Sequence, residues 1–154
     1  MSFDDRVRRF WEECCAVDST NPQTPFQTWH FGNSHEMARE LAELVIAGKK
    51  TATSSPASVN EIKPDETPVE NGYSVVTGMD GEPLCVIQTT EIRHLPFNMV
   101  DARFAFDEGG GDRSLEYWRT VHRRYFMNET AELGLTFDEF SLVCCERFRL
   151  LFPK

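Results

Sequence analysis

The stretch NSHEMARELAELVIAGKKTATSS, residues 33–55, contains a complete helix followed directly by an extended segment. Asn33 or Ser34 can cap the helix, and with Asn33 as the N-cap, Glu36 stands at the third helical position of a capping box. Gly48 is placed to end the helix in the left-handed conformation. The apolar face is formed by Met37, Leu41, Leu44 and Val45. This helix-to-strand transition predicts a mixed fold of helices and strands.

Two lysines and four hydroxyl side chains follow Gly48: Lys49, Lys50, Thr51, Thr53, Ser54 and Ser55. A threonine hydroxyl is a weak nucleophile unless a base takes its proton, and a lysine can do so only when burial or a nearby positive charge keeps part of it neutral. Lys49 supplies a positive charge next to Lys50. Because residues i and i+3 of a regular strand project to opposite faces, Lys50 and Thr53 converge only if the chain bends between them. The alternative is structural: cations are favoured at a helix C-terminus, and the hydroxyls are solvated.

Three further helical segments are predicted. Residues 4–17 place apolar side chains at helical spacing. Residues 101–106 predict a short helical turn, and residues 113–126 a longer helix that Asp112 or Ser114 caps. The glycine-rich segment 108–112 precedes this last helix as a loop.

Strands are predicted over residues 73–77 and 84–93, as a hairpin, and over residues 140–152. Residues 18–31 are rich in turn-forming residues and predict a loop across the surface. In the last strand Glu146 alternates with apolar residues, so an ionised carboxylate there needs a polar partner such as Lys50 or Arg119. The elements together predict an α+β domain built on a small mixed sheet or barrel.

The composition favours one compact soluble domain of 154 residues with a net charge of −9. This charge disfavours long polyanions but not small ligands. No apolar run has the length of a membrane helix and no secretion signal starts the chain, so we expect a cytoplasmic protein without membrane contact. The five cysteines fit reduced thiols, and no His or Cys spacing predicts a metal site, so we expect neither metal nor cofactor.

Five segments in sequence order resemble the ASCH domain family, a PUA-like β-barrel group. They are FGNS (31–34), GKKTAT (48–53), PLCVIQTTE (83–91), EGGGDRSLEYWR (108–119) and VCCERF (143–148). The resemblance implies a small PUA-like mixed β-barrel flanked by helices, with a cleft. It covers residues 29–154 as one globular unit, on which the helix and loop of residues 1–28 are expected to pack.

The resemblance also implies function. Family members are proposed to bind RNA, and some hydrolyse RNA or an acylated cytidine nucleoside with a Lys, a Thr three residues later and a Glu before the later helix. These positions correspond here to Lys50, Thr53 and Glu108. The chain departs from the family pattern at Gly110, where a second Glu is usual, and at the doubled Cys144–Cys145.

The first hypothesis is therefore a hydrolase acting on an N4-acylcytidine-type amide, in which Thr53 attacks, Lys50 activates and Glu108 assists the leaving nitrogen. The alternatives are a non-catalytic RNA-binding module and a metal-independent ribonuclease on single-stranded RNA, with Lys50 or His122 as its base. The ligand is accordingly a nucleoside or short single-stranded RNA, and the sequence leaves the oligomeric state open. The candidate substrate-binding residues are Lys49, Thr51, Ser54, Asp112, Trp118, Arg119, His122, Glu146 and Arg147.

Several of these candidates also have structural interpretations. Trp118 either packs in the core or stacks on a base. His122 is either a packed histidine or a base, and Glu146 either a satisfied structural acid or the catalytic carboxylate. Arg119 is either part of a solvated helix face or a phosphate contact.

Overall fold

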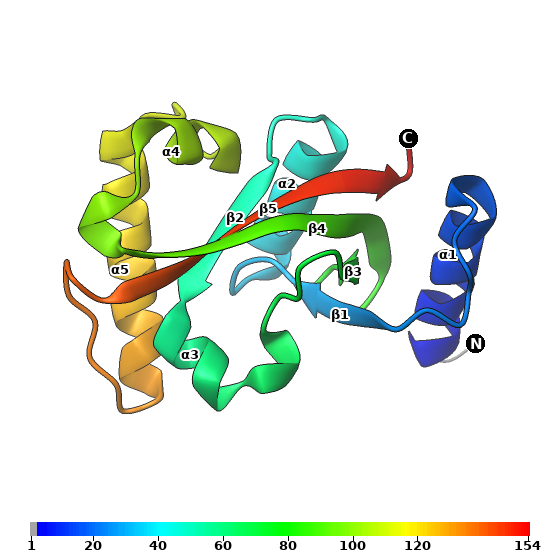
Figure 1. The fold of residues 1–154 in the computed structure, drawn as a ribbon, viewed down its shortest axis with the longest axis horizontal. Coiled ribbons are helices and arrows are strands. Elements are labelled where there is room, and N and C mark those ends of the chain that lie inside the picture. Colours follow the sequence, from blue (N-terminus) through cyan, green and yellow to red (C-terminus); the bar gives the residue numbers. More distant parts are fainter. Residues whose placement is uncertain (1–2) are drawn as a thin grey trace.

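The structure is a computed structural model that describes residues 3–154, and Figure 1 shows its elements. Its strands form a single curled sheet in the order β1-β3-β4-β5-β2. The strands are β1 (Phe26–His30), β2 (Ala52–Pro56), β3 (Tyr73–Thr77), β4 (Pro83–Pro96) and β5 (Leu142–Phe152). β1 and β3 are parallel and the other pairs antiparallel, so the sheet is mixed and β1 and β2 are its edges.

Helices surround this half-barrel. They are α1 (Phe3–Asp18), α2 (His35–Ile46), α3 (Ala57–Ile62), α4 (Ala102–Glu108) and α5 (Leu115–Glu132), with short 3-10 turns at Pro64–Glu66 and Phe97–Met99. In Figure 1, α1 lies at one end of the sheet and α4 and α5 lie at the other. The predicted α+β class and the PUA-like architecture are confirmed.

The two main helix starts follow from local sequence. Ser34 is the N-cap of α2, and its hydroxyl accepts a hydrogen bond from the Met37 backbone at 3.1 Å. Ser114 caps α5 in the same way, while the Asp112 carboxylate accepts from the Ser114 backbone at 2.9 Å. Of the two predicted caps at each start, the serine is therefore the N-cap both times. Gly48 follows α2 with a φ of +79°, as predicted.

The buried apolar side chains form three clusters. The first lies between the sheet and α4–α5 and includes Phe97, Trp118 and Phe126. The second joins α1 to the sheet through Trp11, and the third lies under α2 around Phe31. Three separate apolar clusters thus pack the sheet against α1, against α2, and against α4 and α5.

Three parts of the structure differ from the sequence prediction. The predicted loop over residues 18–31 contains β1, which pairs in parallel with β3. The helix α3 was not predicted, and Val17, the last apolar residue of the predicted helix over residues 4–17, is 59% exposed. The expected division at residue 28 falls inside β1, and it remains a prediction.

None of the helices among residues 3–154 combines the length and apolar character that a membrane crossing requires.

Candidate functional site

A pocket of about 740 Å³ opens beside the edge strand β2. Its walls come from the end of β1, from α2, α3, α4 and α5, from β5, and from Lys50 and residues 53–55. Because β2 has only one neighbouring strand, the pocket reaches side chains of both its faces, and Thr53, Ser54 and Ser55 all line it. Two residues of the predicted GKKTAT segment, Lys50 and Thr53, therefore line the cavity.

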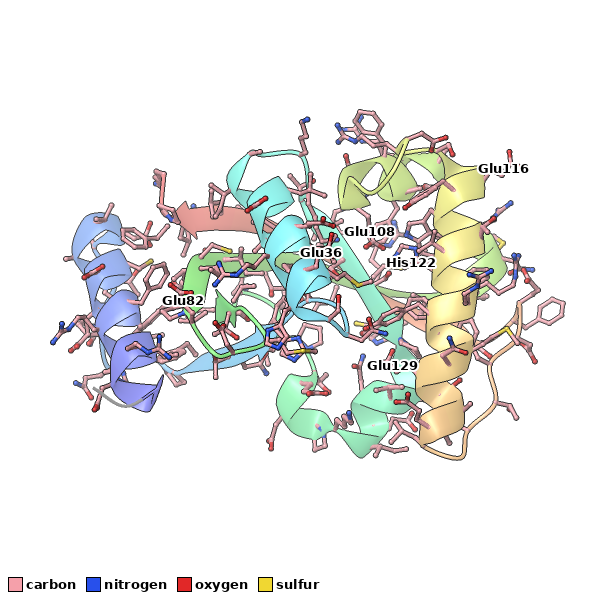
Figure 2. All side chains as sticks on the ribbon, turned by 180° about the vertical axis from the view of Figure 1, so that it is seen from behind. Glu36, Glu82, Glu108, Glu116, His122 and Glu129 are labelled. Carbon is pink, nitrogen blue, oxygen red and sulfur yellow. The ribbon has the colours of Figure 1, made fainter. Side chains whose placement is uncertain are left out.

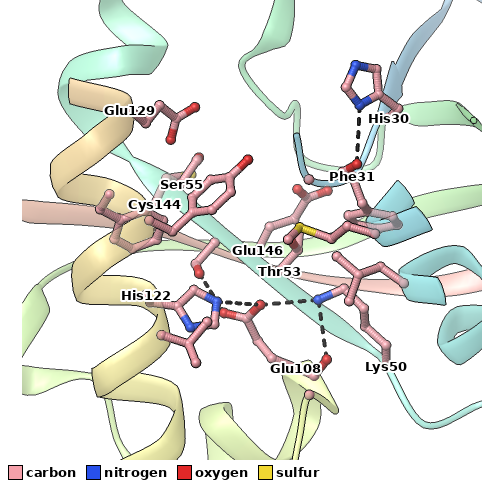
Figure 3. Close-up of a pocket in the computed structure, with 18 of the residues that line it drawn as sticks. His30, Phe31, Lys50, Thr53, Ser55, Glu108, His122, Glu129, Cys144 and Glu146 are labelled. Carbon is pink, nitrogen blue, oxygen red and sulfur yellow. Dashed lines mark hydrogen bonds and ion pairs between the residues drawn. The ribbon is translucent and has the colours of Figure 1, made fainter. Parts of the chain in front are cut away.

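Glu108 at the end of α4 is the most highly connected side chain of the pocket (Figure 3). Its Oε1 lies 3.2 Å from Lys50 Nζ and 3.5 Å from His122 Nε2. Its Oε2 accepts hydrogen bonds from Ser54 Oγ at 2.5 Å and from Trp118 Nε1 at 2.7 Å. Both carboxylate oxygens thus have two donors or cations each, which satisfies a group that is only 4% exposed.

The surroundings of Glu108 keep it ionised. Burial alone would raise its pKa, but the charges of Lys50 and His122 and the hydrogen bonds from His122 and Ser54 together hold the pKa of this carboxyl well below its usual value. In the resting site Glu108 is therefore an anion.

Lys50 is buried between Glu108 and the Phe31 ring, whose centroid is 5.2 Å from Nζ. Nζ also donates to the Glu108 backbone carbonyl at 3.3 Å. Strand β2 begins only at Ala52, so the alternation of a regular strand does not apply to Lys50. Lys50 and Thr53 consequently line the same pocket, as the hypothesis requires.

Glu146 lies on β5 directly opposite Thr53 on β2. Its Oε2 accepts a hydrogen bond from Thr89 Oγ1 at 2.6 Å, so its polar partner is Thr89. Burial raises the pKa of Glu146, against the opposing effects of the Thr89 hydrogen bond and the Lys50 charge. Two carboxyl groups with opposite pKa shifts therefore flank Lys50.

Gly109 explains how the α4 end reaches Lys50. It has a φ of +82°, and a Cβ built on it would lie 2.8 Å from the Lys49 carbonyl oxygen and 3.3 Å from the Lys50 Cα. A residue with a side chain does not fit between these backbones. The glycine-rich segment thus permits the close approach that places Glu108 against Lys50.

The pocket brings together seven of the predicted site residues: Lys50, Thr53, Ser54, Glu108, Trp118, His122 and Glu146. The other five lie outside its lining. Lys49, Thr51 and Asp112 are exposed on the surface. Arg147 pairs with Asp107 at 2.6 Å, and Arg119 is directed to the Asn98 carbonyl at 3.5 Å.

Some lining residues have no signal in the sequence. Asn60 of α3 lines the pocket and exchanges hydrogen bonds with Ser55, at 3.2 and 3.3 Å. Glu129 and Tyr125 extend the α5 wall beyond His122, and Figure 2 shows Glu129 further along that helix than His122. Asn60 was missed because α3 itself is short and without periodicity, and Glu129 was missed because it lies beyond residue 126, where the helix was predicted to end.

The charge of the pocket lining is predominantly negative. It includes five glutamates, Glu40, Glu66, Glu108, Glu129 and Glu146, and two lysines, Lys50 and Lys63. Lys50 is already paired with Glu108, and Lys63 lies 3.9 Å from Glu66. Within residues 3–154 no three His, Cys, Asp or Glu side chains are grouped as metal ligands would be.

Known proteins resemble the chain in sequence and structure. The family model of the ASCH domain matches residues 27–151. The crystal structure of an ASCH domain from Lactobacillus crispatus JV V101 is 32% identical, has a TM-score of 0.85, and the match covers 96% of this chain and 94% of that one. A protein from Enterococcus faecalis V583 is 31% identical, with a TM-score of 0.84 and coverage of 95% and 88%.

A third structure, a hypothetical protein, is 17% identical with a TM-score of 0.52 over 80% of this chain and 99% of that one, and it shares the fold alone. No curated protein matches the chain. The match of the family model over most of the sequence, together with two relatives above 30% identity, shows that this chain belongs to the ASCH domain family.

Proposed function

We propose that this protein is a hydrolase that cleaves the amide bond of an N4-acylated cytidine or a closely related nucleoside. The observation that carries the proposal is that Lys50, Thr53 and Glu108 line one pocket, with Lys50 hydrogen-bonded to Glu108. These are a base, a nucleophile and an acid that can divide the steps of acyl transfer between them.

The reaction begins with the transfer of a proton from Lys50 Nζ to the Glu108 carboxylate, 3.2 Å away. Neutral Lys50 then takes the Thr53 hydroxyl proton as Thr53 Oγ bonds to the acyl carbonyl carbon. The carbon–nitrogen bond breaks and Glu108 returns its proton to the leaving nitrogen, which gives the free cytosine amine. Water hydrolyses the acyl ester on Thr53, releasing the carboxylic acid and restoring the hydroxyl.

The charge of the pocket supports a nucleoside in preference to a polymer. Its carboxylates outnumber its lysines, and the whole chain carries a net charge of −9. Each phosphate of RNA would be repelled by this field, whereas an uncharged nucleoside would not be. Apolar walls from Trp29, Phe31 and Tyr125 offer ring surfaces to a base.

The test is hydrolysis of N4-acetylcytidine, followed by chromatography for released cytidine. We expect turnover by the wild type and a fall in kcat of at least about 100-fold in Lys50→Met, the usual size of a lost acid–base group. The matched comparison is Lys49→Met, because the Lys49 side chain is exposed and outside the pocket lining. We expect its kcat/KM to stay within about twofold of the wild type. Thermal unfolding checks that both variants are folded.

Two outcomes contradict the proposal. Failure of the folded wild type to release cytidine from acylated cytidines would refute it, and short single-stranded RNA would then be tested for binding and for cleavage. Equal losses in Lys50→Met and Lys49→Met would refute the assignment of Lys50.

A further inference from the structure

The mechanism above leaves one ionisable group in contact with Glu108 unused. His122 lies on α5, half-buried, with its ring stacked on Trp118 at a centroid distance of 4.5 Å and an interplanar angle of 17°. The two residues are four positions apart and so share one face of the helix. Both approach the Glu108 carboxylate, Trp118 at Oε2 and His122 at Oε1.

The hydrogen bonds of His122 define which ring nitrogen carries a proton. Nδ1 lies 2.9 Å from the Trp118 backbone carbonyl oxygen. A carbonyl only accepts, so Nδ1 is the protonated nitrogen of the neutral ring. Nε2 of the neutral ring carries no proton, and at 3.5 Å from Glu108 Oε1 it can accept a proton once that oxygen holds one. Beside the ionised carboxylate, which only accepts, Nε2 forms a hydrogen bond only when His122 is protonated.

Glu108 Oε1 therefore contacts both side chains: Lys50 Nζ lies 3.2 Å away and His122 Nε2 lies 3.5 Å away. With neutral His122, a proton that leaves Lys50 for Oε1 meets an acceptor on its other side. With protonated His122, Nε2 donates to the same oxygen, holds Glu108 as an anion and opposes that transfer.

We propose that His122 is a positioning residue that acts through Glu108, receiving at Nε2 the proton that passes from Lys50 through Glu108 Oε1. The proposal rests on the proposed function. The Nζ–H bond of Lys50 breaks and an Nε2–H bond forms on His122. Glu108 Oε1 receives the proton from Lys50 and passes it to His122, so the protonation of Glu108 does not change overall. When the amide carbon–nitrogen bond breaks, the proton returns through Glu108 to the leaving nitrogen, and His122 is neutral again.

Other ionisable groups surround this relay. They are Lys50 before β2, Cys144, Cys145 and Glu146 on β5, and Tyr125 and Glu129 on α5 itself. Burial raises the pKa of Cys144 to about 11 and that of Cys145 to about 12, and it also raises the pKa of Tyr125, so these groups stay protonated near neutrality. Burial raises the pKa of Glu146 and of Glu129 as well, which makes these two the competing assignments in a pH profile.

The test compares the pH profile of kcat for wild type, His122→Gln and Glu146→Gln, with N4-acetylcytidine as substrate. The kcat of the wild type should rise with pH, because only a ring without a proton on Nε2 can receive one there. A glutamine amide can donate to Glu108 but cannot accept a proton, so His122→Gln should lose about 10-fold or more in kcat, keep KM within about twofold, and lose the ascending limb. His94→Gln is the matched control, because His94 is exposed on β4 and outside the pocket. Glu129→Gln should keep the limb.

A second readout does not depend on turnover. Nitrogen-15 NMR of the neutral wild-type ring should show the proton of His122 on Nδ1, and thermal unfolding should show that His122→Gln is folded. A proton on Nε2 would overturn the relay. An ascending limb in the kcat profile of His122→Gln would also overturn the relay. This holds even if Glu146→Gln or Glu129→Gln removes that limb. An inactive wild type would refute the proposed function and the relay together, whereas an active wild type with an unchanged profile in His122→Gln would refute the relay alone.

Discussion

Gly109 and Gly48 form a matched pair of left-handed glycines, with φ of +82° and +79°. They differ in what a Cβ would meet: the Lys49 carbonyl oxygen at 2.8 Å from Gly109, and nothing within 4 Å of Gly48. A residue with a side chain would therefore have a strained backbone at either position. Only at Gly109 would its Cβ also collide with neighbouring atoms.

Gly48→Ala should lower the free energy of unfolding by about 1 kcal/mol, the strain of a left-handed alanine. Gly109→Ala should cost about 1–3 kcal/mol more, because the backbones of α4 and the Lys49–Lys50 segment must separate. Urea unfolding measures both, and equal losses would contradict the close approach at Gly109.

The two buried glutamates predict opposite pH effects on stability. The pKa of Glu108 is lower in the folded protein than its ordinary value of 4.5, so its stabilising contribution is present above about pH 4.5 and is lost as the pH falls below it. The pKa of Glu146 is raised, so its contribution is present below about pH 4.5 and is lost as the pH rises above it.

Urea unfolding between pH 3 and pH 7 tests this sign. Glu108→Gln should lose less stability than the wild type on acidification, whereas Glu146→Gln should lose more. The same slope in both variants would contradict the assignment of opposite shifts.

At the level of single residues, the sequence predicts the site where the chemistry is local. Lys50 and Thr53 are three positions apart and belong to one short segment, so a motif identifies both. Arg119 was predicted as a possible phosphate contact and Arg147 as a substrate-binding residue, and both remain predictions. Their side chains are directed to the Asn98 carbonyl and to Asp107. The direction of an arginine side chain on a helix such as α5 or a strand such as β5 depends on tertiary packing that no local motif encodes.

Among the elements, β2 positions the site because it is an edge strand. Its partner β5 fixes the register that places Thr53 opposite Glu146, and its free side opens the pocket to Ser54 on the other face. A central strand would have a neighbour in this place. The candidate site therefore depends on the strand order as much as on the residues of β2.

Helix α2 ends immediately before this segment, and its N-cap offers a test of the assignment. Ser34→Ala should lower the free energy of unfolding by about 1 kcal/mol, since the hydroxyl accepts from the Met37 backbone. Asn33→Ala should change it by no more than about 0.5 kcal/mol, because Asn33 is not the N-cap. Thermal or urea unfolding distinguishes them, and the reverse order would show that Asn33 caps the helix.

Two elements, β1 and α3, could not be predicted from the sequence because they carry no local signal. β1 is five residues long and pairs in parallel with β3, more than forty residues later, so its pairing leaves no local turn signal. Helix α3 has six residues, too few to show a helical period. The long, capped helices and the β3–β4 hairpin are readable because their signals lie within each segment.

For the whole molecule, the net charge of −9 predicts how the proposed reaction responds to salt. Hydrolysis of an uncharged nucleoside should change less than about twofold in kcat/KM between 50 and 500 mM NaCl. A ligand held through about three phosphates would instead weaken about 100-fold over this range. Steady-state kinetics across the salt series provide the measurement, and a steep decline would favour an RNA ligand.

Each of the three apolar clusters contains or contacts one tryptophan. Trp11 is in the cluster under α1, Trp118 in the cluster under α4 and α5, and Trp29 packs against the cluster under α2. Each indole is thus an intrinsic fluorophore for a different part of the molecule. Trp118 donates to the Glu108 carboxylate and Trp29 lines the pocket, so their emission reports on the site. The emission of Trp11, buried beside Phe26, reports instead on whether the amino-terminal helix is docked.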